Sequence, residues 1–242
     1  MQSKALKIIS LIDRIVSQTI VILFAFVLCV CIYVIYDSIR IHNETKIISD
    51  AGSLIENTPD EDRISELKKT NSEITAWITL DGTAVDYPIT QTSNNQFYLS
   101  HDYKKNYSIA GNIFADYRSN LLTDDYAVIY GHNMNGESMF GELNKFEDKS
   151  FFGQHGSGKI YLEDGSLHDL SVLNFAIVAS DNEYSYELEK VANGANESII
   201  KYISSISFNK SDTDKYPNTL ILLSTCYKHS SQRAVLLVGY NR

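Results

Sequence analysis

Cys226 closes an apolar stretch near the C-terminus, and Arg233 follows it seven residues later. The first half of "TLILLSTC", residues 219–226, is apolar without alternation, which is typical of a central strand. Alternation along this strand puts four residues on one side: Leu220, Leu222, Ser224 and Cys226. The next strand is expected to begin at Arg233, after the polar loop "YKHSSQ". Antiparallel pairing around that loop would set Cys226 opposite Arg233, with Cβ atoms about 4.5 to 5.5 Å apart.

This pairing gives Cys226 a reason to be reactive. A guanidinium beside a thiol favours the thiolate, and it can also receive negative charge that develops on a bound carbonyl oxygen. The other two cysteines, Cys29 and Cys31, lie in an apolar N-terminal run, so the rest of the chain has no internal disulfide. An odd cysteine in an exported domain indicates either an intermolecular crosslink or a reactive thiol.

A cysteine nucleophile usually works with a proton carrier, and His132 is the best candidate among six histidines. It ends the predicted strand "YAVIYGH" directly after Gly131, which lets the backbone turn tightly and leaves the imidazole at the rim of the sheet. His229 lies in the polar loop, where solvation is expected. Cys226 and His229 could form half of a metal site, but no second ligand pair follows at zinc spacing, so we expect no metal and no cofactor.

The overall charge excludes one class of function. The chain has a net charge of −9, and beyond residue 36 it holds 18 basic against 29 acidic residues. A domain with this balance has no cationic surface for a phosphate backbone, so nucleic-acid binding is not expected.

Residues 15–36, "IVSQTIVILFAFVLCVCIYVIY", contain no charged side chain. As a helix this run would span about 33 Å, enough to cross the hydrocarbon core of a bilayer. It is too long for the apolar region of a signal peptide and lacks small residues for cleavage, which favours an uncleaved anchor over a buried core helix. More basic residues precede the run than closely follow it, so we expect residues 1–14 in the cytoplasm and the C-terminal domain outside.

The rest of the chain predicts a stalk and one β-rich domain. Residues 37–57 suit a helical stalk, and "TPDE", residues 58–61, matches a capping box for a helix that runs to about Thr70. From Ala76 onward short β-rich runs dominate, with turn signals at Asp81-Gly82 and Asp164-Gly165. Helical patches interrupt them at residues 137–146 and 186–206. The pattern favours a closed β-barrel with helical insertions, in a domain covering residues 58–242.

Five segments, in order, resemble the class B sortases, the membrane-anchored cysteine transpeptidases of Gram-positive bacteria. They are "AWITLDGTAVDYPITQ", "NNQFYLSHDY", "AGNIFADYRSN", "YAVIYGHNMNGESMFGELNKF" and "LILLSTCYKHSSQRAVLLVGY". The "GHNM" and "MFG" motifs, with a long helix inserted between the last strands, favour class B over other sortase classes. The resemblance implies an eight-stranded β-barrel.

The resemblance also implies roles for individual residues. Cys226 corresponds to the nucleophile, His132 to the general acid and base, and Arg233 to the arginine that binds the oxyanion. Four further residues correspond to positions that contact the substrate: Asn95, Leu99, Tyr184 and Ser224.

The implied activity is cleavage of a C-terminal sorting signal, NPxTN-like or related, after its threonine. A thioacyl enzyme on Cys226 would then pass the secreted protein to an amine of a cell-wall precursor, at the membrane surface where both partners are held. Two alternatives remain open: an exported cysteine peptidase that only hydrolyses, and a non-enzymatic membrane-tethered barrel in which Cys226 is a small buried hydrophobe. Papain-like peptidases place cysteine before histidine in the chain, whereas here histidine comes first.

Overall fold

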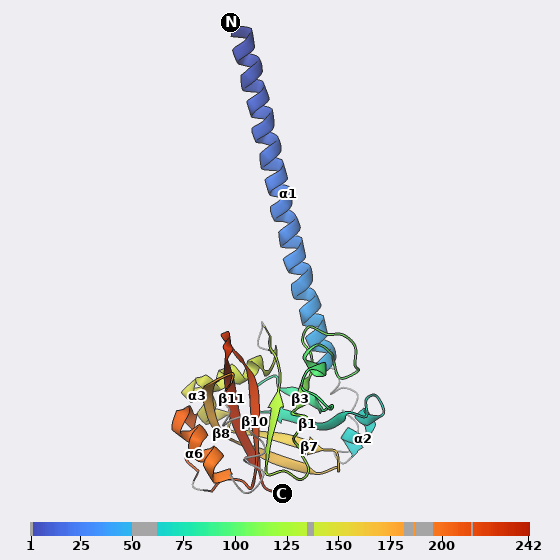
Figure 1. Ribbon diagram of the computed structural model, residues 1–242, viewed down its shortest axis with the longest axis vertical. Helices are drawn as coiled ribbons and strands as arrows, with labels where there is room; N and C mark the ends of the chain where they lie inside the picture. The colour runs from blue at the N-terminus through green and yellow to red at the C-terminus, as the bar shows by residue number, and fades with distance from the viewer. Residues whose placement is uncertain (1, 50–61, 135–137, 182–185, 187–195, 214) are drawn as a thin grey trace. The chain divides into compact units, whose positions relative to one another are not determined.

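The structure, a computed structural model, describes residues 2–49, 62–134, 138–181, 186, 196–213 and 215–242. It divides into an N-terminal unit that ends at Asn43 and a second unit, Glu44–Arg242. Figure 1 shows a long helix in the first and a β-rich domain in the second.

The N-terminal helix α1, Gln2–Ser49, is continuous through the predicted anchor. Its segment Ile8–Arg40 reaches a mean hydropathy of 2.9, and all side chains from Ile8 to Tyr36 are exposed. By length and composition this segment could cross a membrane, which would cover apolar surface that water penalises. The predicted helical stalk is helical to Ser49, and its remainder lies outside the described residues.

Eight strands of the second unit close into a barrel. They are β1 (Ile74–Leu80), β2 (Asp86–Thr90), β3 (Ile113–Ala115), β4 (Tyr126–Tyr130), β7 (Ser157–Leu162), β8 (Leu167–Ala179), β10 (Thr219–Tyr227) and β11 (His229–Tyr240). Neighbours follow the order β11-β10-β4-β3-β2-β1-β7-β8, and the pairing of β11 with β8 closes the ring. The pairs β4–β10 and β2–β3 are parallel, and the other pairs of the ring are antiparallel. The predicted eight-stranded barrel is therefore confirmed.

Short elements decorate this barrel (Figure 1). A ninth strand, β9 (Ser207–Lys210), pairs with β8 outside the ring, and β5 (Asn133–Met134) with β6 (Ser138–Met139) forms a small hairpin. The helices are α2 (Arg63–Lys68), η3 (Phe97–Leu99), η4 (Phe140–Glu147), α3 (Lys149–Gln154) and α6 (Asn196–Ile206). The helix expected up to Thr70 is thus observed as the shorter α2, and its expected capping box lies outside the described residues.

The barrel wall has a different apolar cluster on each face. The inner cluster draws on all eight strands and includes Ile221 and Leu223 of β10. On the outer face, Leu220 and Leu222 pack in a second cluster beneath α6, which buries Ile199 and Ile203 there. The period-two alternation predicted for this strand is confirmed.

Both predicted hairpin turns are present. Gly82 joins β1 to β2 and Gly165 joins β7 to β8, with φ angles of 75° and 86°. These angles lie in the left-handed region, where only a residue without Cβ is free of strain.

The predicted loop before Arg233 is wrong in extent. Strand β10 continues to Tyr227, and β11 already begins at His229, so Lys228 alone, at φ 41°, separates the two strands. The residues are polar, but ladder bonds use only main-chain groups, so a polar sequence at an exposed rim can still pair. Cys226 pairs with Arg233 but Tyr227 pairs with His229, so the register shifts between Cys226 and Tyr227. This irregularity accommodates the additional residues of β11.

Candidate active site

The antiparallel register of β10 and β11 pairs Cys226 directly with Arg233, as the sequence predicted. Ser224 pairs with Val235 two residues deeper, where the outer apolar cluster begins. Cys226 and Arg233 therefore stand on the outer face of the barrel, beyond the region that the apolar cluster fills. The thiol of Cys226 is exposed. The binding-barrel alternative assumes that Cys226 is a small buried side chain, and its exposure in the structure contradicts that assumption.

His132 is brought to the same rim by the parallel pairing of β4 with β10. Tyr130 lies beside Ser224, and the N–H of Gly131 donates to the carbonyl of Ser224 at 3.1 Å. A Cβ at residue 131 would come within 2.4 Å of Ile113 Cδ1 and 2.8 Å of the Phe140 ring. Glycine is needed there because the chain passes against packed side chains before it presents His132.

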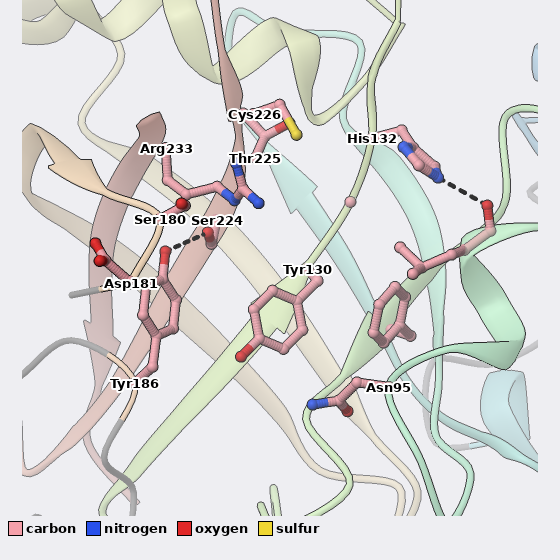
Figure 2. A pocket seen from close by; sticks show the side chains of 13 residues that line it. Asn95, Tyr130, His132, Ser180, Asp181, Tyr186, Ser224, Thr225, Cys226 and Arg233 are labelled. Carbon is pink, nitrogen blue, oxygen red and sulfur yellow. Dashed lines mark hydrogen bonds between the residues drawn. The ribbon is translucent and has the colours of Figure 1, made fainter. Parts of the chain in front are cut away.

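The imidazole of His132 is oriented by a main-chain carbonyl. Nε2 lies 2.7 Å from the carbonyl oxygen of Leu99, and since a carbonyl only accepts, Nε2 carries the proton. In the neutral ring the lone pair is then on Nδ1. Figure 2 shows this second nitrogen on the side of the ring that faces the sulfur of Cys226.

Asn133, the next residue, ties the histidine segment to the nucleophile. Its side-chain Nδ2 donates to the main-chain carbonyl of Cys226 at 2.7 Å. Asn133 is not among the site residues predicted from the sequence, although its place directly after His132 in "GHN" was a usable signal. Together with the Gly131 bond, it fastens the His132 segment to β10 on both sides of the imidazole.

These groups border one cavity of about 480 Å³. Its lining comprises Asn95, Leu99, Phe114, Tyr130, Gly131, His132, Ser180, Asp181, Tyr186, Ser224, Thr225, Cys226 and Arg233. In the view of Figure 2 the sulfur of Cys226 lies between the guanidinium of Arg233 and the imidazole of His132. The three side chains expected to do chemistry thus share a ligand-sized hollow, which is the usual setting of an active site.

The predicted substrate contacts divide into two groups. Asn95, Leu99 and Ser224 all line the cavity, and Leu99 is 44% exposed. Tyr184 lies outside the described residues. Tyr186, which the sequence analysis did not identify, lines the cavity, and its hydroxyl lies 2.9 Å from Ser224 Oγ.

Two tyrosines form an uncharged wall of the cavity. Burial raises the pKa of Tyr186, although its bond with Ser224 and the charge of Arg233 act against this. Burial also raises the pKa of Tyr130, and the nearby carboxylate of Asp116 adds to the effect. Their rings stack with centroids 6.1 Å apart, so this wall stays neutral and aromatic at physiological pH.

Comparisons with known proteins agree with this geometry. No family model matches the chain. Sortase B of Listeria monocytogenes is 35% identical over 153 residues, which cover 60% of this chain and 61% of that protein. Sortase B of Staphylococcus aureus is 33% identical over 94 residues, covering 38% of each protein. The alignments thus span less than two thirds of these curated relatives.

The structural similarity is more extensive. The X-ray structure of sortase B from Clostridium perfringens matches with a TM-score of 0.65 and 28% identity, over 74% of this chain and 99% of that chain. The sequence relatives, the closed mixed barrel and this structural match agree with one another. In sequence and in fold, the chain is similar to the class B sortases.

Proposed function

We propose that the protein is a cysteine transpeptidase that cleaves a C-terminal sorting signal and joins the released protein to an amine. The similarity to class B sortases in sequence and in fold supports this activity. Within the molecule, one observation carries the proposal: the pairing of Cys226 with Arg233 at a cavity that His132 also lines. A thiol, a permanent cation and a proton carrier at one cavity are the groups that acyl transfer requires.

In the first half of the reaction, the Cys226 thiolate attacks the carbonyl carbon of the signal's threonine. Arg233 stabilises the oxyanion that forms. The intermediate collapses as the C–N bond breaks, and the His132 imidazolium gives its proton to the departing amine. A thioester on Cys226 remains, and His132 is neutral.

In the second half, an amine of a cell-wall precursor attacks the thioester. Neutral His132 accepts the proton of this amine, and the Cys226 thiolate leaves as the new amide bond forms. His132 thus alternates between acid and base and returns to its starting state. This cycle needs no cofactor and no net change in oxidation state.

The N-terminal helix fits this role as an anchor. We propose that residues 1–14 are cytoplasmic, 15–36 cross the membrane, 37–57 form the stalk and 58–242 form the external catalytic domain. The surplus of basic residues before the apolar run supports this orientation. An enzyme held at the membrane meets both a secreted protein and a lipid-linked acceptor there.

Mass spectrometry of the detergent-solubilised full chain tests the mechanism. The chain is incubated with a panel of NPxTN-like peptides, with and without triglycine or diaminopimelate as acceptor amine. We expect a thioacyl adduct on Cys226 whose mass equals the peptide up to its threonine, and conversion of that adduct to an amide when acceptor is added.

Two results would overturn the proposal. Full peptide cleavage by a Cys226→Ala variant would remove the nucleophile from the mechanism. Release of hydrolysed peptide alone, even with abundant acceptor, would identify the cysteine peptidase that the sequence left open.

A further inference from the structure

Asp116 is a buried carboxylate behind the cavity wall, and it does not line the cavity itself. It directly follows β3 and is 0% exposed. Oδ1 accepts from the main-chain N–H of Arg118 at 3.0 Å and from its Nε at 2.9 Å. Oδ2 accepts from Arg118 Nη2, from Asn95 Nδ2 and from the Tyr130 hydroxyl, each at 2.9 Å. Every partner of this carboxylate is a donor.

These partners support the side of the cavity that carries Asn95, Tyr130 and Tyr186. Asn95 and Tyr130 line it directly. Nη2 of Arg118 also donates to the main-chain carbonyl of Tyr186 at 3.1 Å, so the network reaches the third residue. The amide of Asn95 is held from its other end as well, because its Oδ1 accepts from the N–H of Tyr117 at 2.9 Å.

The charge of Asp116 is maintained by these contacts. Burial acts to raise its pKa, but the hydrogen bonds from Arg118, Tyr130 and Asn95 outweigh burial and hold the pKa below its ordinary value. Asp116 is therefore ionised at neutral pH, and its oxygens hold the Tyr130 hydroxyl as a donor. Because the hydroxyl already donates to Asp116, Tyr130 offers a ligand mainly the face of its ring.

We propose that Asp116 is a positioning residue that fixes the Asn95–Tyr130–Tyr186 wall for recognition of the acyl-donor peptide. The inference rests on the proposed function, since it assigns that wall to peptide binding. This wall presents to the ligand the stacked rings of Tyr130 and Tyr186. It also presents the N–H and the oxygen lone pair of Asn95 that are not used in the bonds to Asp116 and Tyr117. The thiol, imidazole and guanidinium are held by other bonds, on β10, β11 and the segment after β4.

Asp116→Asn is the sharpest test, because it keeps the size of the side chain. In either orientation of the new amide, its NH2 group faces groups that are themselves donors. We expect the KM for the peptide to rise about tenfold, with kcat and the rate of Cys226 alkylation by iodoacetamide within about twofold of wild type. Alkylation does not involve the peptide, so it reports on the thiol alone.

Glu142→Gln is the matched control. Glu142 is 3% exposed, pairs with Lys145 at 2.8 Å and accepts from the N–H of Ala84 at 2.7 Å, and none of these residues lines the cavity. This variant loses a buried carboxylate that is paired with a lysine elsewhere in the domain. We expect its KM to stay at the wild-type value, even where its unfolding midpoint falls as far as that of Asp116→Asn.

An unchanged KM in Asp116→Asn, or an equal rise in Glu142→Gln, would overturn the inference. If the wild-type protein accepts no peptide at all, the proposed function fails. The positioning of Asn95 by Asp116 is then tested without a peptide. NMR of the Asn95 side-chain amide serves this purpose: solvent exchange that is at least about tenfold faster in Asp116→Asn supports the inference, and unchanged exchange overturns it.

Discussion

The two sides of the cavity are built by different means. On the catalytic side, Cys226 and Arg233 are placed by main-chain pairing of two strands. His132 is placed by the main-chain bond of Gly131 to β10 and by the bond of its own ring to the carbonyl of Leu99. On the opposite wall, side chains from distant segments converge on one buried carboxylate, Asp116. The first arrangement follows from strand register. The second depends on side chains that meet only in the folded barrel.

This difference has a functional meaning under the proposed mechanism. A nucleophile and its oxyanion donor must keep a fixed separation through two acyl transfers, and a strand ladder is among the stiffest supports that a protein offers. The wall has to fit one peptide segment among many, and a side-chain network can be altered one residue at a time. If the two sides are as separate as their construction indicates, a substitution on one side should leave the function of the other side unchanged.

The largest effect is expected for Arg233→Ala. Removal of one oxyanion donor typically lowers kcat by about 10² to 10³. Loss of the cation that pairs with Cys226 should also slow alkylation, because a neighbouring guanidinium attracts the negatively charged sulfur that attacks iodoacetamide. Peptide cleavage and iodoacetamide kinetics measure the two effects. Arg242→Ala, which removes a cation paired with Asp125, is the control and should change neither. Wild-type alkylation in Arg233→Ala would show that the strand pairing does not activate the thiol.

Gly131→Ala should damage the catalytic side through packing. The new Cβ would meet Ile113 at 2.4 Å, and overpacking of this kind costs about 1–3 kcal/mol of stability. Urea unfolding measures the loss. Gly153→Ala is the matched control, because a Cβ there meets nothing within 4 Å. A Gly131→Ala variant as stable as Gly153→Ala would mean that the close approach behind His132 is not tight.

Acid should weaken the wall network in a defined window. Because the folded-state pKa of Asp116 lies below its unfolded value, its contribution to stability is present above about pH 4 and is lost as pH falls through the folded pKa. The stability difference between wild type and Asp116→Asn should therefore narrow as pH falls from 5 to 3. Urea unfolding at several pH values measures it. A difference that stays constant would indicate that Asp116 is not ionised in the folded protein.

The smallest effect is expected for Asn133→Ala, which removes one hydrogen bond to the carbonyl of Cys226. A bond of this type contributes about 0.5–1.5 kcal/mol, so kcat should fall about two- to twelvefold with KM unchanged. Steady-state kinetics separates the two constants. Asn120→Ala, whose side chain accepts from Leu122 in a loop, is the control. A rise in KM instead would connect the two sides of the cavity.

The sequence was informative where a pattern repeats along the chain. Alternation in residues 219–226 predicted which side of the strand carries Cys226, and the turn signals at Gly82 and Gly165 predicted two hairpins. The pairing of Cys226 with Arg233 was also predictable, although the loop between them was not. Polarity does not by itself indicate a loop there, because the main chain of polar residues can extend a hairpin at a rim.

By itself, the amino-acid sequence determined the barrel, the apolar N-terminal helix and the strand that carries the thiol, because period-two alternation and uninterrupted hydrophobicity are local properties. The tertiary structure alone decided that Asn133 holds the carbonyl of Cys226, that Tyr186 reaches Ser224, and that Asp116 gathers the wall behind the cavity. Such contacts join residues 14 to 93 positions apart. They depend on how the barrel closes and on which side chains remain buried there with donors to satisfy, and no local pattern encodes either.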